Sequence, residues 1–404
     1  MRNAQIAFLS ILTMSACQSS KGTAFIQPAQ STRIKGSSDV SICSWNVALA
    51  PGMNIDAARR TPYVIEYLRT LLQRCDVISL QEVWRPQDAK MIIKTLGLRN
   101  DQWHYVDSRT KEVRPGDHCR NASSTGMKMC TKKTCRVETN ENETICAKEE
   151  CGLSLAAQWL TDVGCFNCMV AGVGHTADEI YQRCVHGAGA SYVYDGGNGT
   201  MIITRLHLGQ KDALRLPTSN AIRLALKATL YGAQSGPVTI VSVHLSSSQV
   251  LPPTHESFST WEEEKIAQLR AVHDFAGPEA MIVGDLNAGP NFGELSGESP
   301  GVWNEVLRLG YTSPLAGPFP AQCTVCPDNL LRFDASTASA IDHILLSKVL
   351  RKRFIPIFVH VLSQPTLEYC RPGTYVVCKK RFTAPISDHE PIIVGFTVRN
   401  KHKN

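Results

Sequence analysis

Four short polar motifs, each beside a run of apolar residues, constrain this chain more than any other feature. They are Ser44-Trp45-Asn46, Leu80-Gln81-Glu82-Val83-Trp84, Gly284-Asp285-Leu286-Asn287 and Ser387-Asp388-His389. The adjoining runs, at 40–43, 76–80, 280–283 and 391–396, read as buried strands. A fifth strand at 239–243 leads to His244, and a sixth begins at Ile341 and carries Asp342. We therefore expect these polar side chains to meet at one rim of a sheet.

A single acid after an apolar strand is weak evidence, since many strands end at solvated polar residues. The ordered set WN, QEVW, VHL, GDLN, DH and SDH is far more specific. On these motifs the chain resembles the endonuclease/exonuclease/phosphatase superfamily from about residue 40 to 398, apart from one insert. The resemblance implies a DNase-I-like α/β fold, a four-layer sandwich of two packed mixed β-sheets flanked by helices.

The N-terminus has the pattern of a short export signal. Arg2 precedes the apolar stretch 6–14, which is too short to span a bilayer, and the small residues Ser15 and Ala16 follow. Residues 14–17 look like a bacterial lipobox, which would make Cys17 a lipidated first residue; an ordinary signal cut near the same place is the alternative. We expect a signal over 1–17, a flexible polar tether over 18–38 and the enzyme domain over 39–400. The protein is then a membrane-anchored lipoprotein or a secreted or periplasmic protein.

Cysteine usage agrees with export. Setting Cys17 aside, 14 of the 15 cysteines remain, an even number that suits an oxidising compartment. Eight crowd into the region 108–190, which interrupts the domain and reads as a disulfide-stapled insert. A four-thiolate zinc site made by Cys165-x-x-Cys168 and Cys323-x-x-Cys326 is the less favoured alternative. Cys43 and Cys75 fall on core-facing positions and are expected to be buried thiols.

Two helices frame the motifs. Thr61-Pro62 predicts a helix start, because threonine caps helices and proline suits their first turn. A second helix is expected over 262–276, with Leu269 and Val272 facing inward, just before the strand that ends at Asp285.

The acids and amides of the motifs suit a metal-assisted phosphate site. Glu82 is the strongest candidate metal ligand, because a carboxylate oxygen suits Mg²⁺, with Mn²⁺ or Ca²⁺ as alternatives, and Asn46 is expected beside it. Asn46 and Asn287 carry amides that can orient phosphate oxygens without adding negative charge. Asp285, two residues before Asn287, is expected to fix the attacking water or a protonated histidine.

Two histidines complete the expected catalytic set. The resemblance makes His389 the general base, oriented by Asp342 or Asp388, and His244 the general acid. A lone histidine in an apolar strand is more often a satisfied core residue, but the accompanying motifs reverse that preference. His343 is expected to be structural.

The sequence thus predicts a Mg²⁺-dependent phosphodiester hydrolase. The contexts of Glu82 and of the two histidines look most like sphingomyelinase-type enzymes, which cleave phospholipid head groups; an extracellular DNase-I-like endonuclease is the alternative. A net charge of +6 fits either anionic substrate, phospholipid or nucleic acid, without choosing between them. A second alternative is an inactive scaffold whose insert binds a surface partner. No obligate protein partner is inferred; the membrane is the expected partner of a lipid on Cys17.

Overall fold

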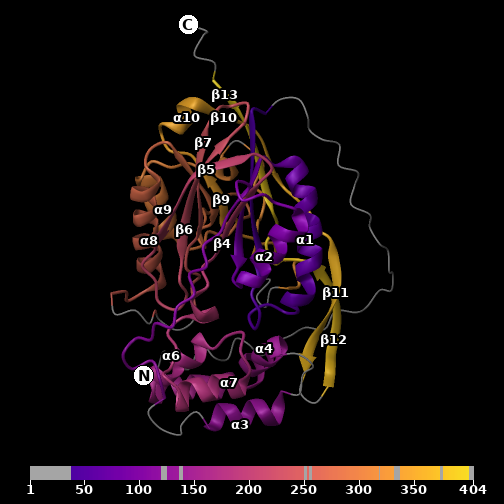
Figure 1. Cartoon of the computed structure of the whole chain (residues 1–404), viewed down its shortest axis with the longest axis vertical. Helices are drawn as coiled ribbons and strands as arrows, with labels where there is room; N and C mark the ends of the chain where they lie inside the picture. The colour runs from indigo at the N-terminus through magenta and orange to yellow at the C-terminus, as the bar shows by residue number, and fades with distance from the viewer. Residues whose placement is uncertain are drawn as a thin grey trace. The chain divides into compact units, whose positions relative to one another are not determined.

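Two β-sheets pack face to face in the computed structural model (Figure 1). The structure describes residues 38–119, 125–135, 140–249, 253, 257–317, 319–331, 337–373 and 376–399. All of them belong to one unit, Arg33–Asn404. The expected export signal, Cys17 and nearly all of the tether lie outside the described residues.

The first sheet is six-stranded, in the order β10-β13-β1-β2-β4-β3. Its strands are β1 (Val40–Leu49), β2 (Val77–Val83), β3 (Trp103–His104), β4 (Gly199–Thr204), β10 (Phe354–Val361) and β13 (Ile392–Val398). The second sheet is five-stranded, β5 to β9 in chain order, and a separate pair is formed by β11 and β12. These strands are β5 (His207–Arg215), β6 (Leu224–Tyr231), β7 (Val238–His244), β8 (Ala280–Asp285), β9 (Asp342–Leu345), β11 (Thr366–Gly373) and β12 (Val376–Pro385). Both larger sheets are mixed, because β1 runs parallel to β2 and β7 parallel to β8, while the other pairs are antiparallel.

Alternating apolar residues explain the layers. Ile42 and Val77 of the first sheet and Ile240 and Met281 of the second share one buried core between the sheets. The helices α1 (Ala57–Arg74) and α2 (Pro86–Leu96) cover the outer face of the first sheet. The helices α8 (Trp261–Ala276) and α9 (Pro300–Arg308) cover the outer face of the second (Figure 1). The predicted four-layer α/β sandwich is therefore confirmed.

The two predicted framing helices differ in how well their starts were foreseen. Helix α8 begins at Trp261, one residue before the expected 262, and Thr260 caps it, accepting from the Glu263 N–H while Glu263 reaches back to the Thr260 N–H. The predicted start of the first helix at Thr61 is wrong. Helix α1 begins at Ala57, and the Thr61 hydroxyl donates back to the Ala57 carbonyl instead of capping. Within the described ranges, no helix is long and apolar enough to cross a bilayer.

The region between β3 and β4 carries the cysteine-rich insert. Its helices are α3 (Thr125–Thr134), α4 (Asn140–Glu150), α5 (Gly152–Thr161), α6 (Val163–Ala171) and α7 (Ala177–Tyr181). Four disulfides join its eight cysteines to one another: Cys119–Cys165, Cys130–Cys151, Cys135–Cys146 and Cys168–Cys184. The predicted disulfide-stapled insert is confirmed.

Two further disulfides settle the remaining expectations about cysteines whose side chains the structure describes. Cys323 pairs with Cys326, so the thiols proposed for a zinc site are all engaged in disulfides. Cys43 of β1 pairs with Cys75 after α1. Both are buried as predicted, but the expectation of free thiols is wrong. The β-α-β passage brings the strand and the helix end together, which the separation of 32 residues did not reveal.

Arg60 joins α1 to the loop before the last strand. Its guanidinium is fully buried and donates to three backbone carbonyls, those of Ile55 at 3.0 Å, Ala48 at 2.5 Å and Ile386 at 2.6 Å. If the guanidinium were removed, the Ile55 and Ile386 carbonyls would lose this donor, while the Ala48 carbonyl would keep a bond from Asn54 Nδ2 at 3.2 Å. Arg60 therefore anchors the segment that leads to His389.

Replacing Arg60 with methionine should lower the free energy of unfolding by about 3 kcal/mol, since each buried unpaired acceptor costs about 1–3 kcal/mol. Urea unfolding followed by circular dichroism measures this change. Arg69→Met is the matched control, because Arg69 lies on the same helix with an exposed side chain. Equal stability of the two variants would show that Arg60 does not anchor the segment.

Candidate active site

The polar residues singled out in the sequence meet at one rim of the two sheets. Asn46 lies inside β1 and Glu82 is the last residue but one of β2, because both strands continue through their motifs. His244 and Asp285 are the last residues of β7 and β8. Asp342 is the first residue of the antiparallel strand β9, and His389 lies shortly before β13, separated from it by Glu390 and Pro391. Parallel strand ends and antiparallel strand starts thus place all six residues at one edge; they are Asn46, Glu82, His244, Asp285, Asp342 and His389.

Asn46 connects the two sheets across this rim. Its Nδ2 donates to Asp285 Oδ2 at 3.0 Å and to Glu82 Oε1 at 3.3 Å, and its Oδ1 accepts from the Ala48 N–H at 3.0 Å. The side chain is fully buried. One amide therefore fixes two carboxylates that come from different sheets.

Two of the site residues have a left-handed backbone, which is costly for residues other than glycine. Glu82 has φ 61° and Asn287 has φ 46°. The pairing of β2 with β4 shifts register between Leu80 and Val83, and such an irregularity re-aims a side chain at the end of a strand. Two hydrogen bonds hold Asn287 in place. Its backbone N–H donates to Asp285 Oδ1 at 2.7 Å, and its Nδ2 donates to the Leu245 carbonyl at 2.9 Å.

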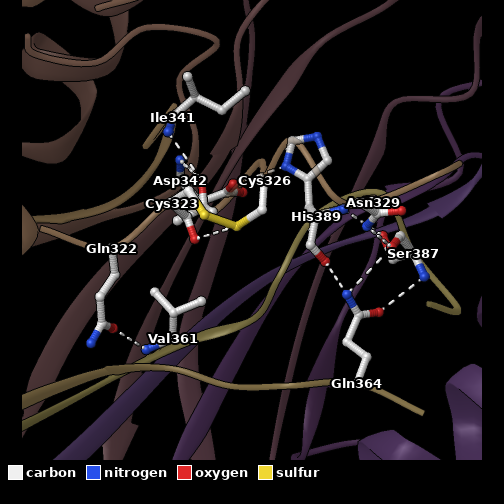
Figure 2. The surroundings of a disulfide bond; sticks show 11 residues. Gln322, Cys323, Cys326, Asn329, Ile341, Asp342, Val361, Gln364, Ser387 and His389 are labelled. Carbon is white, nitrogen blue, oxygen red and sulfur yellow. Dashed lines mark hydrogen bonds and ion pairs between the residues drawn. A yellow bond between two sulfur atoms is a disulfide. The ribbon is translucent and has the colours of Figure 1, made fainter. Parts of the chain in front are cut away.

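Asp342, and not Asp388, is the carboxylate that is hydrogen-bonded to His389. Asp342 Oδ2 lies 2.8 Å from His389 Nδ1, and both side chains are buried (Figure 2). The carbonyl of His389 accepts from Trp45 Nε1 at 3.0 Å and from Gln364 Nε2 at 2.7 Å. The Asp388 Oδ1 atom is buried with no hydrogen-bond partner among the described residues.

The pKa values of His389 and His244 are shifted in opposite directions. Burial disfavours the charged form of His389, but the charge and hydrogen bond of Asp342, together with the charge of Asp285, raise its pKa well above the ordinary value. Burial lowers the pKa of His244 well below its usual range, and the charge of Arg223 lowers it further. His244 Nε2 lies 3.5 Å from Asp285 Oδ2, while its Nδ1 has no partner in the described part of the chain.

Two acids of the site, Asp285 and Glu82, resist ionisation. Burial first, and then the charge of Asp342, raise the pKa of Asp285 to about 7, against the opposing effects of His389 and Asn46. Burial and the charge of Asp388 raise the pKa of Glu82. The rim is therefore a buried concentration of carboxylates that favours positive charge.

Arg223, just before β6, is a site residue that the sequence did not reveal. Its guanidinium carbon lies 4.9 Å from the centre of the Trp84 ring, and Glu82 and Asp285 are the acids that affect it most. The side chain is 6% exposed, and its Nε and Nη1 have no partner among the described residues. An arginine before a strand carries no distinctive signal, since solvated residues often occupy that position.

Tyr194, in the segment between the cysteine-rich insert and β4, packs against the site. Its ring stacks on Trp84 with centres 5.1 Å apart and planes at 25°, and Trp84 in turn lies 5.9 Å from the His244 ring. The Tyr194 hydroxyl donates to the Pro51 carbonyl at 3.0 Å. The segment after the insert therefore supports one wall of the site, and Val173 of the insert packs against the same cluster of Trp84 and Tyr194.

His343 is buried with Nδ1 3.0 Å from the Ser313 hydroxyl and Nε2 3.2 Å from the Ala288 carbonyl, in keeping with a structural residue. Burial lowers its pKa to about 4.

The comparisons with known proteins agree with this geometry. Residues 43–389 match the profile of the Endonuclease/Exonuclease/phosphatase family. The chain belongs to this family, whose members are hydrolases acting on phosphoester bonds. No curated protein sequence matches the chain.

Solved structures with the same fold include SmcL and a sphingomyelinase C. The chain is similar to SmcL, with 14% identity and a TM-score of 0.52, over 89% of this chain and 98% of that one. It is similar to sphingomyelinase C from Streptomyces griseocarneus, with 12% identity and a TM-score of 0.50, over 88% of this chain and 98% of that one. At these identities the likeness establishes the fold.

Replacing Tyr194 with leucine should lower kcat/KM for a phosphodiester by up to about tenfold. An aromatic pair is worth about 0.5–1.5 kcal/mol beyond its buried area, and about 1.4 kcal/mol is tenfold in rate. Tyr194→Phe keeps the ring and should keep most of the activity. Tyr63→Leu, at an exposed position on α1, is the matched control. Undiminished turnover by Tyr194→Leu would show that the stack does not support the site.

Proposed function

We propose that this protein is a divalent-metal-dependent phosphodiester hydrolase that cleaves phospholipid head groups. The observation that carries the proposal is the buried rim at which Asn46, Glu82, Asp285 and His244 meet the hydrogen-bonded pair of His389 and Asp342. Membership of a phosphoesterase family supports the reaction class. An inactive scaffold would have no need to keep so many buried ionisable groups together.

The residues at the rim suit a hard divalent cation. Glu82 and Asp388 are neighbouring acids, and the buried Asp388 Oδ1 has no partner among the described residues. Mg²⁺ takes one or two carboxylates and keeps several waters. We propose Glu82 as its main ligand, with Asn46 and Asp388 beside it. When bound, the cation supplies positive charge that offsets the phosphate and opposes the proton on His389.

A second acidic cluster lies close by. Asp285, Asp342 and His389 place ligand atoms within 4.8 Å of one another, and all three are buried. The imidazolium of His389 already offsets both carboxylates, since it lies 2.8 Å from Asp342 and 3.9 Å from Asp285. We therefore assign this cluster to proton transfer rather than to metal binding.

His389 and His244 are the proposed base and acid. With a cation bound nearby, His389 would be held in its neutral form, which can take a proton from water, and Asp342 stabilises the imidazolium that then forms. The low pKa of His244 makes its protonated form a strong acid toward the leaving oxygen. A phosphate dianion or monoanion beside His244 favours that protonated form.

The phosphate itself has three proposed contacts. Arg223 offers buried N–H groups without partners, and a guanidinium matches phosphate geometry. Asn46 and Asn287 are the proposed amide contacts. Both Nδ2 hydrogens of Asn46 donate to Asp285 and Glu82, so Asn46 would have to release one of them to bind the phosphate. Asn287 Nδ2 donates one hydrogen to the Leu245 carbonyl and keeps a second for the substrate.

The lipid substrate rests on resemblance. The stretch from Glu82 into helix α2 looks like that of sphingomyelinase-type enzymes, and a solved sphingomyelinase C shares the fold. A nuclease remains the competing function, because a net charge of +6 also suits a nucleic acid. Export to an oxidising compartment is supported by six disulfides. Anchoring through Cys17 is part of the same proposal.

The deciding experiment measures phosphocholine release from sphingomyelin liposomes beside nicking of supercoiled DNA, with Mg²⁺ and at two salt concentrations. We expect head-group release that chelation abolishes and Mg²⁺ restores, and that Glu82→Gln loses. Binding that tracks several nucleic acid phosphates weakens steeply with salt. Salt-sensitive nicking without head-group release would establish the nuclease instead, and no turnover of either substrate would leave the scaffold.

Leaving groups distinguish the roles of the two histidines. A p-nitrophenolate group leaves without protonation, whereas an alkoxide needs a proton from the acid. His244→Ala should therefore lose about 10²–10⁴-fold in kcat on a phosphodiester with an alkoxide leaving group. It should lose much less on a phosphodiester with a p-nitrophenolate leaving group. His389→Ala should lose a comparable factor on both. The reverse pattern would exchange the two roles.

A further inference from the structure

A disulfide closes a tight loop beside the His389–Asp342 pair. Cys323 and Cys326 are separated by three positions, and Figure 2 shows the bridge next to Asp342 and His389. A disulfide stabilises a fold mainly by restricting the unfolded chain, and the effect grows with the length of the closed loop. This bridge closes the shortest loop of the six, whose sequence separations are 3, 11, 16, 21, 32 and 46 residues. Its main effect is therefore to fix the native loop itself.

Thr324, inside that loop, contacts the chain segment of Asp342 and the chain segment of His389. Its Oγ1 accepts from the backbone N–H of Ile341 at 3.1 Å and of Asp342 at 3.3 Å. Its carbonyl accepts from the N–H of Glu390, the residue after His389, at 2.7 Å. Thr324 is fully buried, so these bonds form away from water. One residue thus connects the start of β9 to the segment that carries His389.

Neighbouring bonds hold the loop in register. Thr324 and Val325 donate their N–H groups to the Ser339 carbonyl at 2.9 and 3.0 Å, and Ser339 donates back to Val325 at 2.9 Å. Gln322 Oε1 accepts from the N–H of Val361 on β10 at 2.7 Å (Figure 2). The loop is therefore attached to the segment just before β9 of one sheet and to β10 of the other.

The Asp342 carboxylate depends on this support. Its Oδ2 bonds His389, and its Oδ1 has no partner among the described residues. Asp342 also stands directly opposite Asp285 in the β8–β9 ladder, where like charges repel. Apart from His389, no described hydrogen bond holds the Asp342 carboxylate, and Asp285 repels it. The direction of the carboxylate therefore depends on where the Asp342 backbone is held.

We propose that Thr324, held by the Cys323–Cys326 disulfide, is a positioning residue that sets the hydrogen bond between Asp342 and His389. The inference rests on the proposed function only in that the bond serves catalysis; the geometric claim stands without it. Loss of the threonine hydroxyl or of the disulfide then slows turnover without weakening substrate binding.

The test compares Thr324→Val, which removes the hydroxyl at nearly constant shape, with Thr324→Ser, which keeps it. Steady-state kinetics use bis(p-nitrophenyl) phosphate, a diester that does not depend on lipid presentation. We expect Thr324→Val to lose roughly 10²-fold in kcat, the scale of a 1 Å misplacement, with KM nearly unchanged and Thr324→Ser close to wild type. The double variant C323S/C326S should resemble Thr324→Val, whereas C135S/C146S, which opens a disulfide within the insert, should not.

A spectroscopic measurement separates this inference from the proposed function. A proton shared between His389 Nδ1 and Asp342 gives a downfield resonance that Asp342→Asn removes. The resonance should shift or broaden in Thr324→Val and in C323S/C326S, and persist in Thr324→Ser. If wild-type protein shows no turnover, the proposed function fails while the resonance still decides the positioning role. Wild-type kcat in Thr324→Val, equal losses in the valine and serine variants, or an unchanged resonance in C323S/C326S would overturn the inference. If Thr324→Val does not fold, C323S/C326S decides with the same two measurements.

Discussion

The hydrogen bonds of one amide, Asn46, hold the site together. Two parallel strand pairs, one in each sheet, end at the same rim, and this topology brings acids from both sheets within reach of each other. Without a donor between them, Glu82 and Asp285 would repel one another in a buried setting. Asn46 bonds both, and Ser387 donates to the Asn46 carbonyl at 2.6 Å, so the segment that carries His389 depends on the same residue.

The rim stores unfavourable free energy. Buried acids with raised pKa values and left-handed backbone at Glu82 and Asn287 would be selected against in a plain structural core. The buried cores between the two sheets and beneath the flanking helices hold these residues in place. Positive groups that complete the charge balance, such as Arg223 and His389, lie in the same small volume.

The sequence predicted those parts of the molecule that depend on local pattern. Asp285 and Asn287 could be placed at a strand end because an apolar run leads directly to them. Long-range partners could not be placed in this way. The Cys43–Cys75 bridge, the contact of Arg223 with Trp84, and the start of α1 at Ala57 depend on how distant segments meet. The choice of Asp342 over Asp388 as the partner of His389 likewise needed the strand register, because both acids are close to a histidine in the sequence.

The cysteines of the insert pair only with one another. No covalent bridge joins the insert to the sandwich, and its removal would strand no half-cystine in the remaining domain. Such a segment can be acquired, lost or exchanged between related genes without disturbing oxidative folding of the core. Evolution can therefore change this segment in one step, while the polar rim and the two bridges described within the sandwich, Cys43–Cys75 and Cys323–Cys326, stay as they are.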